Sequence, residues 1–285
     1  MGFCGCGLRP KLARAALHQW EEPCISGTRG SGTVFFSGCT LRCCYCQNFQ
    51  ISHMQFGKEV SVQRLSEIFL ELQAQGAHNL NLVSPTPYVP AICEALDLCA
   101  SKRCIPVIYN TGGYERPETI RMLKNYIDIY LTDMKYCDAE TAQRYSGKAD
   151  YFTYAAPALL EMVRQTGAPR FDSNGLLRSG VIVRHLVLPG QRKQGIRIME
   201  WLADQNLQDK ILLSLMRQYT PIGTDSAHPE IHRKVTTFEY QSVVDAAVEL
   251  GLTHGFMQEC GSETLDYTPS FDLKGVESSV SDDLI

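Results

Sequence analysis

Apolar residues recur along the chain in two patterns. Short continuous apolar runs, bounded by Gly, Pro, Asn or Ser, indicate strands that are buried on both faces. These runs occupy residues 33–37, 79–84, 105–109, 127–132, 181–188 and 211–216. Longer segments in which apolar residues recur three and four positions apart predict helices. These segments occupy residues 61–76, 89–102, 116–126, 153–166, 195–205 and 237–250.

The regular alternation of strands and helices predicts a parallel sheet with right-handed crossovers. Six strand–helix units, rather than eight, favour an incomplete barrel, although the count alone does not separate such a barrel from a doubly wound sheet. The length of 285 residues and the 44% hydrophobic content suffice for one large core. Residues 13–20 add a short predicted helix before the first strand. We expect His18 and Trp20, beside Glu21 and Glu22, to belong to a packed cap.

Charge and hydropathy narrow the class of protein. The net charge of -4 and the pI near 6.0 argue against a nucleic-acid or membrane-surface binder, which needs clustered Lys and Arg. No apolar run reaches the length of a membrane span, and residues 1–30 lack the pattern of a signal peptide. The sequence therefore predicts a cytoplasmic protein, in which the 12 cysteines are reduced thiols.

A cysteine-rich loop follows the first predicted strand. Cys39, Cys43 and Cys46 have the spacing CxxxCxxC, which offers three thiolates on one short loop. A four-iron cubane held at three corners keeps one iron open for another ligand. Cys39, Cys44 and Cys46 form an alternative triple, but the single residue between Cys44 and Cys46 crowds two ligands. We interpret Cys44 as a packing thiol.

Other interpretations of the cysteines are weaker. A structural zinc site usually pairs one CxxC with a second pair farther along the chain. Cys4 and Cys6 form a further close pair, but they are too tightly spaced to serve easily. We interpret Cys4, Cys6 and Cys24 as thiols without a metal.

Three segments carry a resemblance to a known family. Residues 38–48 resemble the cluster loop of radical S-adenosylmethionine (SAM) enzymes, and residues 30–37 resemble the activating enzymes of glycyl radical enzymes. Residues 18–27, His-Gln-Trp-Glu-Glu-Pro-Cys-Ile-Ser-Gly, are similar to a phrase in the uncharacterised pyruvate formate-lyase-activating-like branch. The resemblance runs from Gly2 to Gln258. It implies an α/β fold, namely a partial (β/α)6 TIM-like barrel of the radical SAM type.

The resemblance also implies cofactors, domains and function. The cofactors are a [4Fe-4S] cluster and SAM, and the expected domains are an N-terminal extension over residues 1–30, the barrel over 31–258 and a mobile C-terminal segment over 259–285. The reduced cluster would cleave SAM to a 5′-deoxyadenosyl radical, which takes a hydrogen from a glycine in a glycyl radical enzyme. An electron donor such as flavodoxin or ferredoxin is expected. Another peptide or a small metabolite is an alternative substrate, and a non-catalytic metal-stabilised binding module is an alternative class.

Polar residues follow the predicted strands, where ligands gather in parallel α/β folds. By resemblance, the thiolates of Cys39, Cys43 and Cys46 hold the cluster and are the catalytic residues. The resemblance assigns the SAM-binding roles to the following residues: Tyr45 beside the adenine, Ser84 and Thr86 at the amino group in place of the family's Gly-Gly-Glu, Asn110 and Thr111 in a polar turn, and Asp133 and Lys135 at the carboxylate.

Some of these residues have simpler interpretations. Asp133 and Lys135 share one strand face, so they can point together into the barrel or form an ordinary ion pair. Asn110 can belong to a simple turn. Arg184 and His185 lie on opposite faces of one strand. We expect Arg184 to face the SAM site, because an outward arginine within the helix layer would be costly, and His185 to be a core histidine.

Overall fold

The computed structural model describes residues 3–221, 227–258 and 268–277. Its strands are β1 (Lys11–His18), β2 (Ser31–Phe36), β3 (Lys58–Glu59), β4 (Leu80–Val83), β5 (Val107–Thr111), β6 (Ile129–Asp133), β7 (Arg170–Phe171), β8 (Leu177–Leu186), β9 (Leu212–Met216) and β10 (Gly255–Met257). Its helices are α1 (Pro23–Ser26), α2 (Phe49–Ser52), α3 (Val62–Ala74), α4 (Val89–Cys99), α5 (Pro117–Met122), α6 (Ala139–Ser146), α7 (Tyr151–Thr166), α8 (Arg192–Asp204) and α9 (Thr237–Glu249). Short 3-10 turns follow β4 (Thr86–Tyr88) and precede α9 (Pro229–Ile231).

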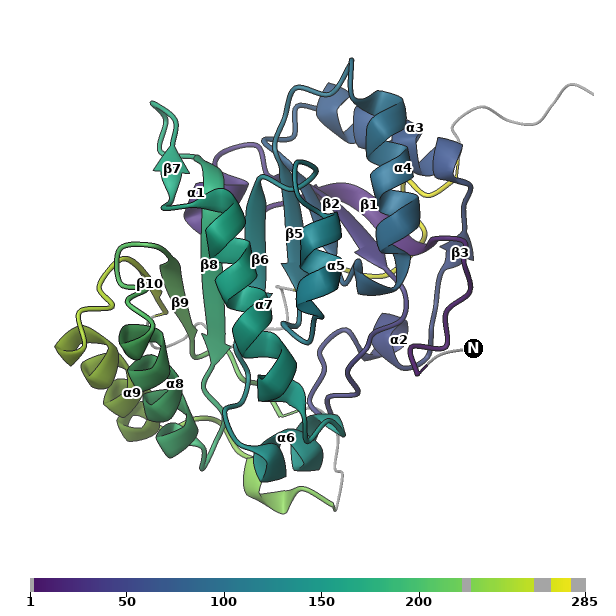
Figure 1. The fold of residues 1–285 in the computed structure, drawn as a ribbon. Helices are drawn as coiled ribbons and strands as arrows, with labels where there is room; N and C mark the ends of the chain where they lie inside the picture. The colour runs from purple at the N-terminus through teal and green to yellow at the C-terminus, as the bar shows by residue number, and fades with distance from the viewer. Residues whose placement is uncertain (1–2, 222–226, 259–267, 278–285) are drawn as a thin grey trace, which may run out of the picture.

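The strands form one open sheet in the order β10-β9-β8-β6-β5-β4-β2-β1-β3, and β7 pairs with β8 (Figure 1). Pairing is parallel from β2 through β4, β5, β6, β8 and β9 to β10. All six predicted strands are present, within a few residues of their expected bounds, and the sheet is an open partial barrel as predicted. β10 extends the parallel series beyond the predicted strands.

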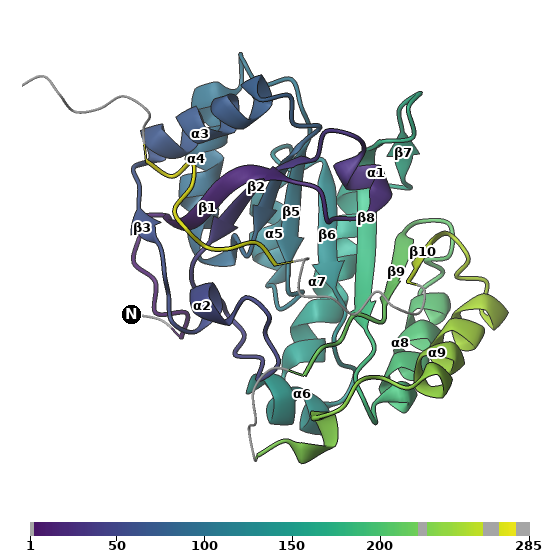
Figure 2. The same cartoon turned by 180° about the vertical axis from the view of Figure 1, so that it is seen from behind.

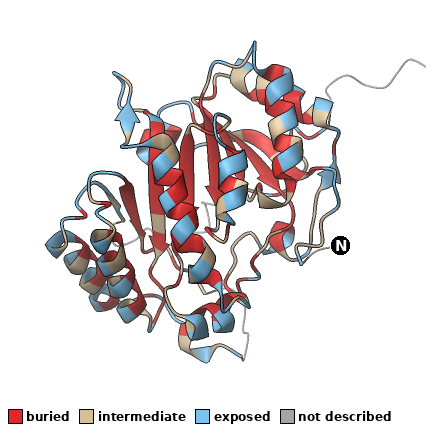
Figure 3. Ribbon diagram, in the orientation of Figure 1, coloured by how far each residue is buried: buried red, intermediate tan, exposed pale blue. Residues whose placement is uncertain are grey.

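The long helices cover one face of the sheet (Figure 1). Figure 3 shows that each turns a buried stripe toward the strands and an exposed stripe outward. In α3 the buried residues include Leu65, Ile68, Phe69 and Leu72, and the Ser61 hydroxyl accepts a hydrogen bond from the Arg64 amide at the helix start. Apolar residues at this spacing bury one helix face, so the periodic pattern correctly predicted these helices.

The predicted helix over residues 13–20 is wrong. Residues 11–18 form β1, which pairs antiparallel with β2 and crosses the side of the sheet opposite the long helices (Figure 2). The segment is rich in Ala and Leu, which favour helices, but a non-local partner strand overrides that weak preference. β1 thereby joins the first 30 residues to the barrel sheet.

The expected mobile segment over residues 259–285 is only partly described. Residues 268–277 lie along β1 (Figure 2), and their mobility stays a prediction. The Ala15 amide donates to the Lys274 carbonyl at 2.8 Å, and the Leu273 amide donates to the Ala13 carbonyl at 3.0 Å. Phe271 packs edge-on against Phe35, with ring centroids 5.4 Å apart. The other expected residues, 259–267 and 278–285, lie outside the described part of the chain.

Candidate active site

A cavity of about 230 Å³ opens at the carboxyl ends of the parallel strands. Its wall contains ten of the eleven predicted side chains: Cys39, Cys43, Tyr45, Cys46, Ser84, Asn110, Thr111, Asp133, Lys135 and Arg184. Thr86 does not line the cavity, because its hydroxyl donates to the buried carboxylate of Glu115 at 2.5 Å. The order of parallel strands thus gathers residues that are far apart in sequence.

The loop between β2 and α2 brings three thiols to the cavity. Each sulfur accepts one hydrogen bond from the protein: Cys39 from the Leu41 amide at 3.4 Å, Cys43 from the Ser146 hydroxyl at 3.0 Å and Cys46 from the Ser52 hydroxyl at 3.3 Å. Donors of this kind stabilise the thiolate form. Cys44 does not line the cavity.

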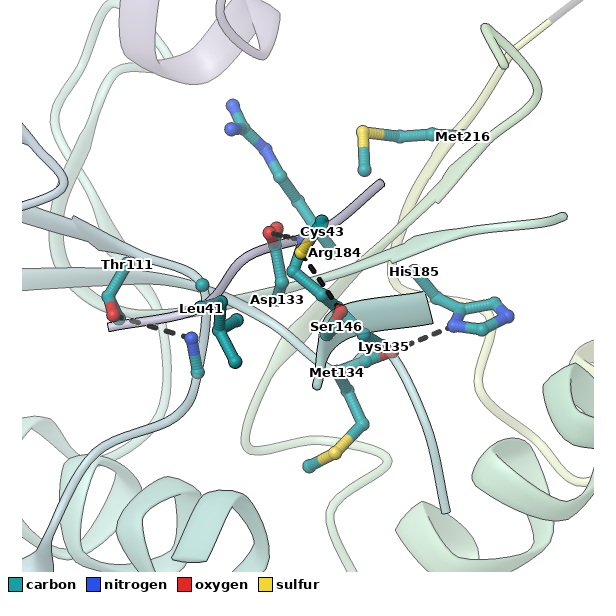
Figure 4. A network of polar contacts seen from close by, with 12 residues as sticks. Leu41, Cys43, Thr111, Asp133, Met134, Lys135, Ser146, Arg184, His185 and Met216 are labelled. Atoms are coloured by element: carbon teal, nitrogen blue, oxygen red, sulfur yellow. Dashed lines mark hydrogen bonds and ion pairs between the residues drawn. The ribbon is translucent and has the colours of Figure 1, made fainter. Parts of the chain in front are cut away.

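Asp133 and Lys135 extend from the end of β6 into the cavity. Their side chains form an ion pair at 2.5 Å, close to Cys43 (Figure 4). Burial opposes the charge of Lys135, but Asp133 and Cys43 more than offset it and raise the pKa of this lysine well above its usual value. The cavity therefore contains, beside the thiols, an ammonium whose charge is favoured by Asp133.

Arg184 and His185, consecutive on β8, point to opposite sides of the sheet as expected (Figure 4). Arg184 lines the cavity, and its guanidinium binds two carboxylates of the N-terminal segment: it contacts Glu22 twice at 2.7 Å, and Glu21 as well. His185 is buried, and its Nδ1–H donates to the Met134 carbonyl at 2.8 Å. His185 is therefore a satisfied core histidine.

Residues 33–202 match the model of the radical SAM superfamily, and they include the three thiols and the Asp133–Lys135 pair. The chain belongs to the radical SAM superfamily. Membership makes it a radical SAM enzyme, with a [4Fe-4S] cluster and SAM as cofactors. The family confirms the resemblance predicted from residues 30–48.

Similar proteins agree with this assignment. The uncharacterized protein MJ0674 of Methanocaldococcus jannaschii is 28% identical over 245 residues, which are 83% of this chain and 66% of that protein. The pyruvate formate-lyase-activating enzyme of Clostridium pasteurianum is 28% identical over 143 residues, which are 48% of this chain and 59% of that enzyme. The chain thus spans less than two thirds of the length of either relative.

A solved structure supports the fold. Streptococcus suis SuiB bound to S-adenosylmethionine superimposes with a TM-score of 0.51, over 79% of this chain and 49% of SuiB. Its sequence identity of 12% makes this a likeness of fold alone.

The thiols of this radical SAM chain fit an iron–sulfur cluster. Burial, together with the neighbouring Cys43, raises the pKa of Cys39 to about 12 and that of Cys46 to about 11. Three negatively charged thiolates are stable together in a buried site only when a cation offsets their charge. The irons of a cluster would supply that positive charge. Among the described residues, no three His, Cys, Asp or Glu side chains lie closely enough to hold a single metal ion. The arrangement therefore fits a cluster with separate irons better than a zinc ion.

The ends of β4 and β5 form the remaining wall. Ser84 adopts a left-handed backbone with φ of 57°, a conformation that costs free energy for a residue with a side chain, and its amide donates to the Asn110 carbonyl at 2.9 Å. Asn110 also donates a long side-chain hydrogen bond, at 3.4 Å, to Glu21. Tyr45 is buried and its hydroxyl lies 2.6 Å from that of Tyr136.

The sequence analysis missed several residues of this site. His18 and Glu21 line the cavity, although they were assigned to a packed cap. Ser52 and Ser146 bind the thiols, and no local motif marks them. Trp20 is 55% exposed. The adjacent carboxylates Glu21 and Glu22, within residues 18–27, could have indicated a buried ion pair, because buried carboxylates need a cationic partner.

No helix in the described part of the chain is both long enough and apolar enough to cross a membrane.

Proposed function

We propose that this chain activates a protein partner by removing a hydrogen from the α-carbon of a glycine. The three hydrogen-bonded thiols, which line one cavity with the Asp133–Lys135 pair, carry the proposal. The similarity to the pyruvate formate-lyase-activating enzyme supports glycine as the target. The activity, substrate and partner of the whole protein are part of this proposal.

A bound [4Fe-4S] cluster would supply the one-electron reduction that cleaves SAM and so provides the radical for hydrogen-atom removal from the substrate. Cys39, Cys43 and Cys46 would hold that cluster through their three thiolates. Lys135 offers its ammonium to the carboxylate of SAM, and Asp133 keeps that ammonium oriented. Ser84, Asn110 and Thr111 supply polar groups for the remainder of SAM.

The far wall of the cavity comes from β8, β9 and the segment after β9. Apart from Arg184, whose charge is paired with Glu21 and Glu22, its residues Leu186, Met216, Gln218, Tyr219 and Thr220 are uncharged. An uncharged wall of mixed polarity suits a neutral polypeptide segment such as a glycine loop. A second candidate is the modification of another peptide, and SuiB, which shares the fold, has been solved bound to the precursor peptide SuiA.

A label-transfer experiment tests the glycine target. The reconstituted protein is reduced with dithionite and incubated with SAM and a protein extract from cells grown on α-dideuterated glycine. We expect 5′-deoxyadenosine to carry deuterium by mass spectrometry. Extracts labelled at alanine and the small molecules removed by ultrafiltration serve as controls. Deuterium from the alanine extract or from the small-molecule fraction alone would refute glycine activation, and the absence of 5′-deoxyadenosine would refute SAM cleavage.

Lys135→Ala should weaken SAM binding. Loss of a charged hydrogen bond costs about 1.5–3 kcal/mol, so we expect the SAM concentration for half-maximal cleavage to rise roughly ten- to a hundredfold. Lys124→Ala, on an exposed turn after α5, is the matched control and should change nothing. An unchanged SAM requirement in Lys135→Ala would remove this lysine from the SAM site.

A further inference from the structure

Three neighbouring strands end in segments that carry candidate SAM ligands. We call residues 84–86 after β4, 110–113 at the end of β5 and 133–135 at the end of β6 the rim segments. β4, β5 and β6 are adjacent in the sheet. The sheet fixes the strands, but the segments beyond their ends need other contacts to keep their spacing. Two buried side chains, Glu115 and Tyr151, supply those contacts.

Glu115 joins the first two rim segments. Its side chain is buried, and its Oε1 accepts hydrogen bonds from the hydroxyls of Thr86 and Thr111, both at 2.5 Å. The Tyr109 hydroxyl donates to the same oxygen at 3.3 Å. The Thr111 hydroxyl in turn accepts the Gly113 amide at 3.3 Å. One oxygen atom therefore fixes the positions of the β4 and β5 ends.

Burying the carboxylate of Glu115 at this position costs free energy. Its Oε2 is buried and has no hydrogen-bond partner in the structure. Burial raises the pKa of Glu115 to about 7, although the hydroxyls of Thr111, Thr86 and Tyr109 lower it. A buried polar atom without a partner is destabilising, so packing alone does not account for an acidic residue at this position.

Tyr151, at the start of α7, joins the second and third rim segments. It is fully buried, and its hydroxyl accepts the Lys135 amide at 3.0 Å. The same hydroxyl lies 2.9 Å from the carbonyl oxygens of Gly112 and Asp133, to either of which it can donate its one proton.

The two segments approach so closely that no side chain fits between them. A Cβ atom at Gly113, where φ is 84°, would lie 2.1 Å from the Asp133 carbonyl oxygen and 2.6 Å from the Tyr151 hydroxyl. Hydrogen bonds through Tyr151 therefore hold backbones that are nearly in contact.

We propose that Glu115 and Tyr151 are positioning residues that set the affinity of the cavity for SAM by fixing the spacing of the three rim segments. Neither side chain lines the cavity, so both act through the residues that do, Thr111, Gly112 and Lys135. The inference rests on the proposed SAM site. It assigns a binding role to two residues with no motif of their own.

Near-isosteric variants test this inference. Glu115→Met, which removes both acceptor oxygens, and Tyr151→Phe are compared with Glu118→Met and Tyr154→Phe, which change the same residue types nearby on α5 and α7 without touching the rim. SAM binding to the reconstituted protein is measured by titration calorimetry. We expect each test variant to raise the Kd for SAM about tenfold and to change the rate at saturating SAM little, because misplaced binding groups weaken binding first. The control variants should bind SAM as the wild type does.

Two further measurements separate positioning from general stability. Hydrogen exchange of the protein without SAM should be faster in the rim segments of the test variants and unchanged in α3. Thr111→Val combined with Glu115→Met should raise the Kd little more than Thr111→Val alone, because the Thr111–Glu115 contact is already absent in the single variant.

The outcomes are distinct. Test variants that remain folded and bind SAM within about twofold of the wild type would overturn the inference, as would a lower unfolding temperature without a change in Kd, since about twofold is within the scatter of independent sites. A wild type that binds no SAM would overturn the proposed SAM site and this inference with it.

Discussion

Replacement of Cys39, Cys43 or Cys46 by alanine, one at a time, should abolish SAM cleavage and most of the bound iron and sulfide. In the proposed site each of these thiolates would bind the cluster, so its loss would remove both a ligand and a negative charge from a buried position. The measurement is anaerobic reconstitution followed by iron and sulfide analysis and by assay for 5′-deoxyadenosine.

Cys44→Ala is the matched control for these variants. Cys44 is in the same loop but does not line the cavity, so its variant should keep the cluster and the cleavage activity. If Cys44→Ala loses activity while Cys43→Ala keeps it, the ligand triple is Cys39, Cys44 and Cys46. Zinc without sulfide in the wild type would contradict the cluster altogether.

Arg184→Ala should destabilise the fold by about 3–5 kcal/mol, the usual cost of breaking a buried ion pair from one side. The carboxylates of Glu21 and Glu22, whose side chains are 8% and 6% exposed, would remain without their cation. The free energy of unfolding in urea measures the effect. Arg178→Ala, at the exposed end of the same strand, should change it by no more than about 0.5 kcal/mol.

The effect of Arg184→Ala should depend on pH. In the wild type, burial raises the pKa of Glu22, but Arg184 outweighs this and holds it below its usual value, so this pair stabilises the fold at neutral pH and loses that effect in acid. In the variant the same carboxylate is stable only when protonated. The unfolded-state pKa cancels between the two proteins, so the difference in unfolding free energy should shrink as the pH falls, beginning at the raised pKa of Glu22 in the variant, above about 4.5. A difference that is constant from pH 4 to 8 would show that Arg184 acts through packing alone.

Local patterns predicted most of the fold because they reflect burial. Leu65 and Phe69 mark the inner face of α3 through their spacing, and the continuous apolar run before Cys39 marks β2. β1 was mistaken for a helix because its residues suit either structure and its partner strand decides between them. β10 has only three residues, too few for a periodic pattern.

The cavity-lining residues were largely predictable because they follow strands. The residues that support them were not. Ser146 reaches Cys43 across 103 positions, and Glu22 reaches Arg184 across 162. Such contacts depend on how whole elements pack. Nothing in the spacing around Ser146 distinguishes it from a surface residue, and the adjacent pair Glu21 and Glu22 does not by itself show that its partner is Arg184.

The ion pairs between Arg184 and the first 30 residues also bear on how much of the chain is needed for activity. A shortened chain that begins at Ser31 would keep every cluster cysteine and every strand of the parallel series. It would lose β1 and the two carboxylates, Glu21 and Glu22, that pair with Arg184. The cavity would then be open to solvent on the side where that segment packs. We therefore expect catalysis in this protein to depend on the segment upstream of the barrel as well as on the barrel itself.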